Sequence, residues 1–143
     1  MPQGGKPLEG PEEPGDHLLE AQFFTAVTGI TKTEADLDKD AERVVTLLRA
    51  LTVRSMGTAD MRNAHDAMNK WIYTPDKKDG KEIPQFTKGT IQMEKSDLDL
   101  GLGMVYKQFG WDEKTGAPTK ATLEALGLQD VAAELGAKGL LPA

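Results

Sequence analysis

The stretch that decides the fold is Gly110–Leu128, which reads GWDEKTGAPTKATLEALGL. Asp112 stands in a turn, where its carboxylate can accept hydrogen bonds from local backbone amides. Pro118 suits the start of a helix because it has no amide hydrogen to leave unpaired there. Gly127 then supplies a stop. The stretch therefore predicts a tight turn followed by a short helix over Thr119–Leu126.

Similar start and stop signals, with apolar residues at helical spacing, predict four further helices: Asp16–Thr28, Thr33–Ser55, Ser96–Phe109 and Gln129–Lys138. Thr33 and Ser96 are the expected caps of the second and third of these. The second is the clearest, because it carries a long apolar stripe made of Leu37, Ala41, Val44, Leu48 and Leu51. A sixth helix over Ala59–Trp71 has only weak periodicity.

Residues 72–95 contain Pro75, Gly80, Pro84 and Gly89, and no part alternates cleanly enough to predict a sheet. The expected fold is therefore all-α, with five or six helices and one long irregular loop at about residues 72–95. Residues 1–15 are rich in Gly, Pro and Glu, which predicts a disordered lead-in. Residues 16–143 are expected to form a single helical domain.

Composition excludes several functions. The net charge is −6 and Lys and Arg are scattered among acidic residues, so no basic stripe marks a nucleic-acid or anionic membrane surface. No run of about eighteen apolar residues predicts a membrane span. The N-terminus does not read as a secretory signal, so a cytoplasmic location is expected. The absence of cysteine excludes disulfides, thiol nucleophiles and Cys-ligated zinc or iron–sulfur sites.

Two patterns of candidate chemistry have simpler explanations. Asp36, Asp38 and Asp40 have the spacing that opens a calcium-binding loop. However, Ala41 and Leu47 stand where that loop needs Gly and Glu, and the run falls inside a predicted helix. We therefore interpret these carboxylates as a solvated helix face and predict no metal site.

His65 and Asp66 suggest a general base, but adjacent residues do not face each other on a helix. Arg54, Asp60, Arg62 and Asp66 form a cluster of alternating charge. An arginine fork could hold a carboxylate or phosphate of a ligand. The simpler interpretation, which we favour, is a salt-bridge network within the protein that holds the irregular segment.

The deciding stretch, with QDVAAELGAKGLLP after it, resembles the C-terminal end of the aldehyde ferredoxin oxidoreductase family. Further back, Glu42–Val44, the pair Arg49 and Arg54, and Ser55–Asp66 also resemble that family. The likeness covers roughly residues 17–142. It assigns a structural role to Arg54, Gly57, Asp60, Arg62, His65, Asp66, Tyr106, Gly110, Trp111, Asp112, Gly116, Pro118, Thr119 and Gly127.

The resemblance implies an enzyme with a tungstopterin or molybdopterin cofactor and a 4Fe–4S cluster, which oxidises aldehydes or reduces activated acids. In that family the cofactor ligands and catalytic groups lie upstream of the matching region, so no catalytic, cofactor-binding or metal residue is assigned here. This chain is expected to be a C-terminal helical segment or split subunit with a structural role. Its partners would be the missing N-terminal cofactor-binding domains.

Two alternatives remain open at the level of sequence. The chain could be a stand-alone helical protein-interaction module without redox activity. It could also be a small hydrolase built on His65, although no nucleophile motif accompanies that residue.

Overall fold

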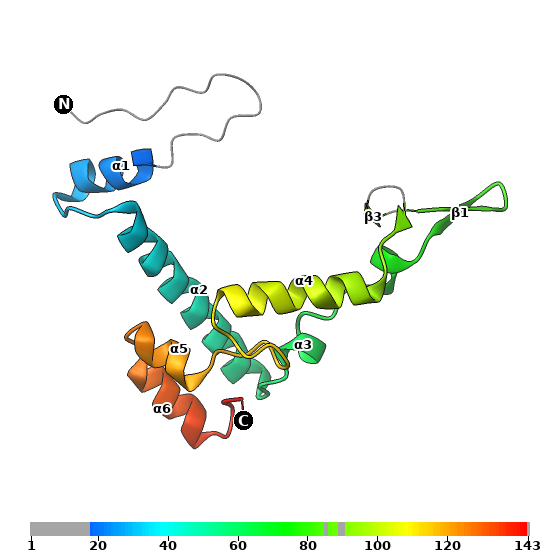
Figure 1. Ribbon diagram of the computed structural model, residues 1–143. Coiled ribbons are helices and arrows are strands. Elements are labelled where there is room, and N and C mark those ends of the chain that lie inside the picture. The colour runs from blue at the N-terminus through cyan, green and yellow to red at the C-terminus, as the bar shows by residue number, and fades with distance from the viewer. Residues whose placement is uncertain (1–17, 85, 89–90, 143) are drawn as a thin grey trace. The chain divides into compact units, whose positions relative to one another are not determined.

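The computed structural model describes residues 18–84, 86–88 and 91–142. The predicted lead-in, residues 1–15, lies outside the described residues, as does Asp16. Contacts divide the chain into two compact units, Met1–Val45 and Thr46–Ala143. The described residues contain six α-helices and little strand, which confirms the predicted all-α class (Figure 1). That residues 16–143 form a single domain stays a prediction.

The first unit contains α1 (Leu18–Thr28) and the beginning of α2 (Glu34–Met56). Thr33 caps α2 as predicted. The Asp36 amide donates to the Thr33 hydroxyl at 3.2 Å, and the Thr33 amide donates to the Asp36 carboxylate at 2.9 Å. This reciprocal pair satisfies two backbone donors at the helix start. Asp36 therefore has a capping role.

The second unit contains the rest of α2 and α3 (Met61–Ala64), the 3₁₀ helix η1 (Lys70–Tyr73), α4 (Lys95–Gln108), α5 (Lys120–Ala125) and α6 (Gln129–Ala137). The weak helix predicted over 59–71 is thus interrupted, since residues 65–69 separate α3 from η1. None of the helices in the described ranges is long and apolar enough to cross a bilayer.

The predicted cap of α4 is wrong by two residues. Glu94, and not Ser96, occupies the cap position, and its amide donates to the Asp97 carboxylate at 2.9 Å. Glu94 and Asp97 form a reciprocal capping box, so the acidic residue three places on decides where the helix begins.

The long loop holds two short antiparallel hairpins that the sequence analysis did not predict. They are β1 (Asp76–Lys78) with β2 (Lys81–Ile83), and β3 (Thr87–Lys88) with β4 (Ile91–Gln92). All six residues of the first pair are exposed, so no buried face imposes an alternating pattern. Asp79 and Gly80 form the turn with φ of 52° and 74°. Asp-Gly is a common sequence for a hairpin turn with positive φ, and it was the missed signal.

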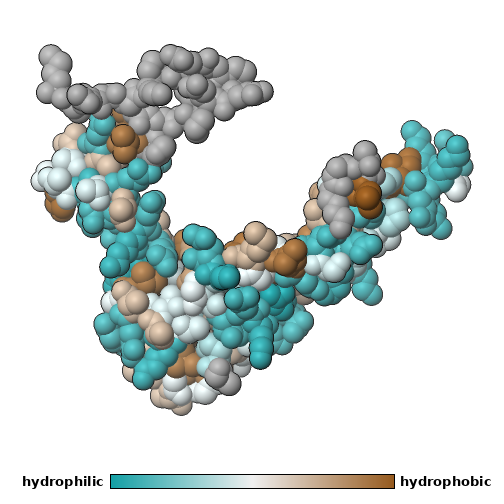
Figure 2. Space-filling model, viewed as in Figure 1, coloured by the Kyte–Doolittle hydropathy of each residue, from teal (hydrophilic) through white to brown (hydrophobic). Residues whose placement is uncertain are grey.

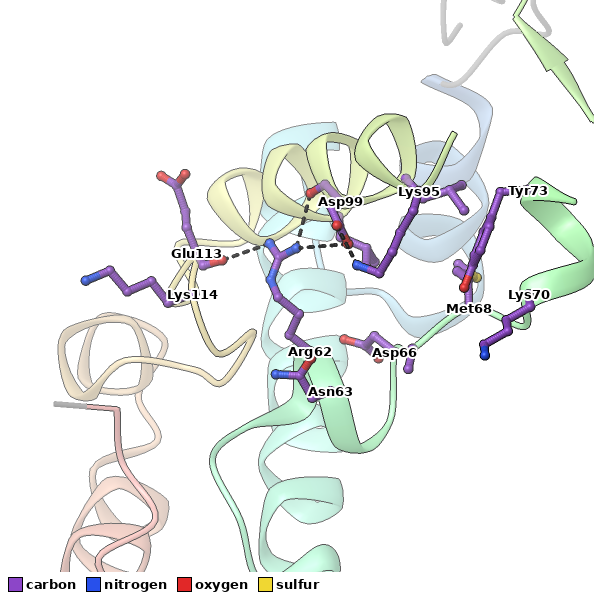
Figure 3. Close-up of a pocket in the computed structure, with 13 residues that line it drawn as sticks. Arg62, Asn63, Asp66, Met68, Lys70, Tyr73, Lys95, Asp99, Glu113 and Lys114 are labelled. Carbon is purple, nitrogen blue, oxygen red and sulfur yellow. Dashed lines mark hydrogen bonds and ion pairs between the residues drawn. The ribbon is translucent and has the colours of Figure 1, made fainter. Parts of the chain in front are cut away.

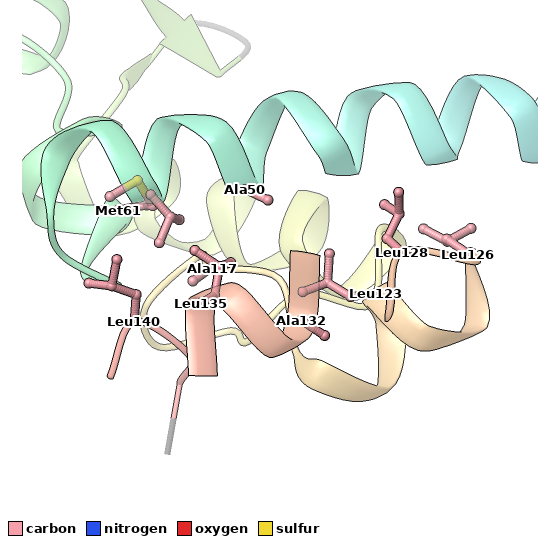
Figure 4. Packing of buried hydrophobic residues seen from close by; sticks show 10 residues of the cluster. Ala50, Met61, Ala117, Leu123, Leu126, Leu128, Ala132, Leu135 and Leu140 are labelled. Atoms are coloured by element: carbon pink, nitrogen blue, oxygen red, sulfur yellow. The ribbon is translucent and has the colours of Figure 1, made fainter. Parts of the chain in front are cut away.

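The core of the second unit lies where α5 and α6 pack against the C-terminal half of α2 (Figure 4). Ala50 and Val53 supply the α2 side of this core. The buried cluster consists of Ala50, Val53, Met61, Ala117, Leu123, Leu126, Leu128, Ala132, Leu135 and Leu140. Small side chains such as Ala50, Ala117 and Ala132 stand among the leucines of this core, and alanine allows packed helices to approach closely.

The apolar stripe that the sequence shows on α2 is not the face that the helix buries. Its buried residues are Thr46, Arg49, Ala50 and Val53. By contrast, Val44, Leu48 and Leu51 of the stripe are 56%, 58% and 40% exposed. The prediction of the helix was therefore correct, but the stripe does not form its packed face.

The Gly-Trp-Asp turn joins α4 to α5 as a small closed loop. Trp111 forms an isolated bridge with Pro118, and the Asp112 amide donates to the Ala117 carbonyl at 2.9 Å. The Asp112 carboxylate accepts from the amide and the hydroxyl of Thr115, both at 2.7 Å. Gly116 closes the loop with φ of 75°. The predicted turn is confirmed, and Asp112 makes the backbone contact expected of it.

Gly116→Ala is expected to lower the free energy of unfolding by about 3 kcal/mol or more, since it combines positive φ with overpacking. An added Cβ would lie 2.6 Å from Tyr106 Cζ and 2.9 Å from Arg49 Nη2. Gly127→Ala is the matched control, because Gly127 has φ of 70° but no atom within 4 Å of the added Cβ. Gly127→Ala should lower the free energy of unfolding by about 1 kcal/mol. Urea denaturation of the full chain measures the free energy of unfolding of both variants. An equal decrease in Gly116→Ala and Gly127→Ala would contradict the predicted clash.

Candidate functional site

The most constrained polar group in the second unit is the Arg49 guanidinium, on the buried face of α2. Its Nη1 donates to Asp66 Oδ1 at 2.9 Å, its Nη2 contacts Asp66 Oδ2, and its Nε donates to the Gly116 carbonyl at 2.8 Å. The two side chains are only 9% and 13% exposed. A buried ion pair is stable only when its donors and acceptors also have hydrogen-bond partners. Arg49 makes three such contacts, two with Asp66 and one with the Gly116 carbonyl.

Two aromatic rings enclose this pair. The Tyr106 hydroxyl donates to Asp66 Oδ2 at 2.6 Å. The guanidinium carbon of Arg49 lies 4.9 Å from the Trp111 ring centroid and 5.7 Å from that of Tyr106. Stacking of this kind stabilises a desolvated guanidinium. We call Arg49, Asp66, Tyr106, Trp111 and Gly116 the Arg49 cluster.

The environment shifts the pKa of two members of the cluster in opposite directions. Burial raises the pKa of Asp66, but hydrogen bonds from Arg49, Tyr106 and His65 outweigh it and hold that pKa well below its usual range. Burial, the hydrogen bond to Asp66 and its negative charge raise the pKa of Tyr106 to about 12. At neutral pH Asp66 is therefore ionised and Tyr106 is protonated, and both oxygens of the carboxylate are already occupied.

His65 and Asp66 do contact each other, contrary to the prediction from helical spacing. His65 is the C-terminal cap of α3, so the backbone leaves the helix there and His65 Nδ1 comes within 2.7 Å of Asp66 Oδ1. His65 is half exposed. Within the described ranges its Nε2 makes no hydrogen bond, so the His-Asp pair has no hydroxyl to activate. The hydrolase alternative gains no support from this geometry.

The predicted charge cluster is divided among separate partners. Arg54 pairs with Glu134 of α6 at 3.5 Å on the surface. Asp60 caps α3 and accepts from the amide of Asn63 at 3.3 Å. Asp66 pairs with Arg49. These residues therefore do not form the predicted network with one another, and Arg54 binds α6 instead of the segment that follows α2.

Arg62 joins α3 to α4 and to the turn after it. It donates to the backbone carbonyls of Asp99 at 3.2 Å and Glu113 at 2.8 Å, and its guanidinium carbon lies 5.0 Å from the Tyr106 centroid. The Tyr106 ring thus lies near the guanidinium groups of both Arg49 and Arg62. The fork of Arg62 is occupied by the protein's own carbonyls.

The remaining motif residues occupy turns and helix ends. Gly57 and Gly110 have φ of 67° and 63° and follow α2 and α4. Thr119 is the N-cap of α5, and its hydroxyl accepts from the Thr122 amide at 3.1 Å. Pro118 is fully buried, and Gly127 has φ of 70° between α5 and α6.

Sequence reasoning did not include Arg49 or Thr46 among the site residues. Thr46 is fully buried and accepts a hydrogen bond from Trp111 Nε1 at 3.3 Å. These two positions are three residues apart on α2, as a shared helix face requires. Polar residues at that spacing usually mark a solvated face, so no sequence signal distinguished them.

The donor atoms of this chain do not fit an iron–sulfur cluster. Iron–sulfur clusters are held by thiolates, and the sequence has no cysteine. In the part of the chain that the structure describes, no group of three or more His, Asp or Glu residues could hold a metal ion. No step of a metal-dependent reaction is therefore assigned to residues of this chain.

The family model described as aldehyde ferredoxin oxidoreductase, domains 2 & 3, matches residues 6–128. The chain belongs to the aldehyde ferredoxin oxidoreductase family. No solved structure matches it. The match includes every residue of the Arg49 cluster and the turn with the Gly-Trp-Asp sequence, so these structural contacts lie in the region that defines family membership.

Arg49→Met is expected to lower the free energy of unfolding by about 3 kcal/mol, because it leaves the Asp66 carboxylate buried without its cation. Arg54→Met removes the exposed pair with Glu134 and should cost less than about 0.5 kcal/mol. Arg49→Lys should not restore stability, since an ammonium cannot bind Asp66 through two parallel hydrogen bonds and also reach Gly116. Chemical denaturation monitored by circular dichroism measures the free energy of unfolding of all three variants. If Arg49→Met left that free energy almost unchanged, the stabilising role of the Arg49–Asp66 pair would be refuted.

Tyr106 is expected to ionise with a midpoint near pH 12. Because its pKa is raised in the folded state, its contribution to stability is complete below the unfolded value of about 10 and is lost between pH 10 and 12. The measurement is the tyrosinate absorbance at 295 nm of the wild type minus that of Tyr106→Phe. A difference curve with its midpoint near 10, in protein that circular dichroism shows to be folded, would be inconsistent with the buried hydrogen bond to Asp66.

Proposed function

We propose that this chain is the C-terminal helical part of an aldehyde ferredoxin oxidoreductase-type enzyme, as a segment of its gene or as a split subunit. The whole enzyme would oxidise an aldehyde or reduce an activated acid, with electrons passing through an iron–sulfur cluster. This chain has a structural role within it and no catalytic activity alone. The family match over residues 6–128 supports the proposal.

The observation that carries the structural role is a pair of apolar helix faces without cover in the second unit. On α2, Leu48 and Leu51 are 58% and 40% exposed. On α4, Leu100 and Met104 are each 67% exposed and Val105 is 48% exposed. Figure 2 shows apolar side chains gathered over α4. Contiguous exposed apolar surface on a helix usually marks a contact with another protein or domain.

The occupant that we propose for these faces is the cofactor-bearing part of the same enzyme. The matching family model describes two domains of a multidomain protein, so further domains belong to the complete enzyme. A tungstopterin or molybdopterin and a 4Fe–4S cluster would be bound there, because this chain offers no thiolate. The cytoplasm would be the site of assembly.

The alternative is a helical interaction module that has kept the family's fold without its redox partner. The packed core of α5 and α6 against α2 gives the second unit its own buried centre, which favours this reading. The two proposals differ in the partner that they predict.

The test is co-purification of the tagged full chain from an extract of its source, with the metal content of the captured protein measured by mass spectrometry. The proposed function predicts a captured protein that contains tungsten or molybdenum in addition to iron. The double variant Leu100→Glu and Met104→Glu should reduce its recovery about tenfold, because it places charge on the α4 face. Its melting temperature should be unchanged, since both residues are exposed.

Gln108→Glu, at an exposed position of the same helix, is the matched control and should retain the partner. A monomeric chain that folds cooperatively and captures no pterin-containing protein would rule out the split-subunit form. A metal-free partner retained by the control and lost from the double variant would favour the interaction module instead.

A further inference from the structure

A cleft of about 690 Å³ opens beside the Arg49 cluster, within the second unit. Its walls come from α3, the segment through η1, the first half of α4 and the turn at residues 113–114. The residues that line it are Arg62, Asn63, Asp66, Ala67, Met68, Lys70, Tyr73, Lys95, Leu98, Asp99, Leu102, Glu113 and Lys114 (Figure 3). Its volume falls within the range of small-molecule sites.

The charges that border the cleft do not cancel. Four cations and three carboxylates line it. One of the carboxylates, Asp66, is already neutralised by Arg49. Four cations therefore face two remaining carboxylates, an excess of two positive charges. This excess stands out in a chain whose net charge is −6.

The cations differ in their availability. The Arg62 guanidinium is engaged with the carbonyls of Asp99 and Glu113, and Lys95 donates to Asp99 at 2.6 Å. In the part of the chain that the structure describes, the Lys70 ammonium makes no hydrogen bond or ion pair. The same is true of the Tyr73 hydroxyl. Among the described residues the Lys114 ammonium also makes no hydrogen bond or ion pair. Figure 3 shows Lys70 and Tyr73 on the same side of the cleft, and Glu113 and Lys114 on the opposite side, where the charge of Lys114 lies near a carboxylate.

The rest of the lining is apolar. Ala67, Met68, Leu98 and Leu102 contribute hydrocarbon surface to the lining. A cleft with an apolar lining and a few available donors at one side orients an amphipathic molecule, because the charged end finds the donors and the body displaces water from the lining. A simple inorganic anion would leave that apolar surface uncovered.

We propose that this cleft binds a small organic carboxylate, with the carboxylate at Lys70 and Tyr73 and an apolar body against Met68, Leu98 and Leu102. A carboxylate fits better than a phosphate. Arg62, the residue best suited to a phosphate, is occupied, and the carboxylates of Asp99 and Glu113 repel a second negative charge. The proposal does not depend on the partner proposed above, because every group involved lies within the second unit.

The test uses the full chain and 4-phenylbutanoate as the probe, with binding followed by nuclear magnetic resonance. The expected result is saturable change at the amides of residues 66–73 and 95–102. The neutral 4-phenylbutan-1-ol and the cationic 4-phenylbutylamine should bind at least about tenfold more weakly, since they lack the charge that the cleft selects. Inorganic phosphate should also bind more weakly, because it lacks the apolar body.

Lys70→Gln should weaken binding of the probe about three- to tenfold, and Tyr73→Phe should weaken it less. Lys78→Gln is the matched control, because Lys78 is an exposed lysine of β1 that does not line the cleft. Equal binding of the alcohol and the carboxylate would overturn the proposal. The proposal would also be overturned if Lys78→Gln and Lys70→Gln lost the same affinity for the probe, or if phosphate bound more tightly than the probe.

Discussion

The second unit depends on one requirement, which is that the buried Arg49 guanidinium be neutralised and hydrogen-bonded away from water. No single neighbouring segment can do this. Asp66 supplies the charge from beyond α3, Gly116 supplies a carbonyl from the closed turn, and Tyr106 and Trp111 supply the aromatic walls. Leaving a buried charge without these partners is far more costly than the net gain from any one contact.

That requirement accounts for two features that are otherwise unexpected. Position 116 must be glycine because the carbonyl that Arg49 needs belongs to a residue pressed against the Tyr106 ring, with no room for a Cβ. Helix α2 must turn its polar residues Thr46 and Arg49 inward, so its apolar stripe faces away from the core of the unit. The exposed apolar face of α2 is thus a consequence of how the core is built.

The helices and the Gly-Trp-Asp turn could be predicted because their signals are local: caps, glycine stops and apolar spacing within a few residues. The hairpin at Asp79 and Gly80 was missed because its strands bury no face, so only the turn residues signalled it. Much of the candidate site was also named in advance, including Asp66, Tyr106 and Trp111. Arg49 was noted only as part of the family likeness and its pairing was not predicted, because pairing between residues far apart in sequence follows from packing, and a polar residue inside a helix gives no local sign of burial.

The contacts of the Arg49 cluster also bear on how the chain folds. They join residues separated by 17, 40, 65 and 67 positions. Helical proteins commonly fold fast because most of their contacts are local, whereas contacts between distant residues slow the search. During synthesis, Arg49 lacks its carbonyl acceptor until residue 116 has left the ribosome. The Arg49 cluster can therefore be complete only after residue 116 has emerged, and the core, which includes Leu140, only after almost the whole second unit has been made.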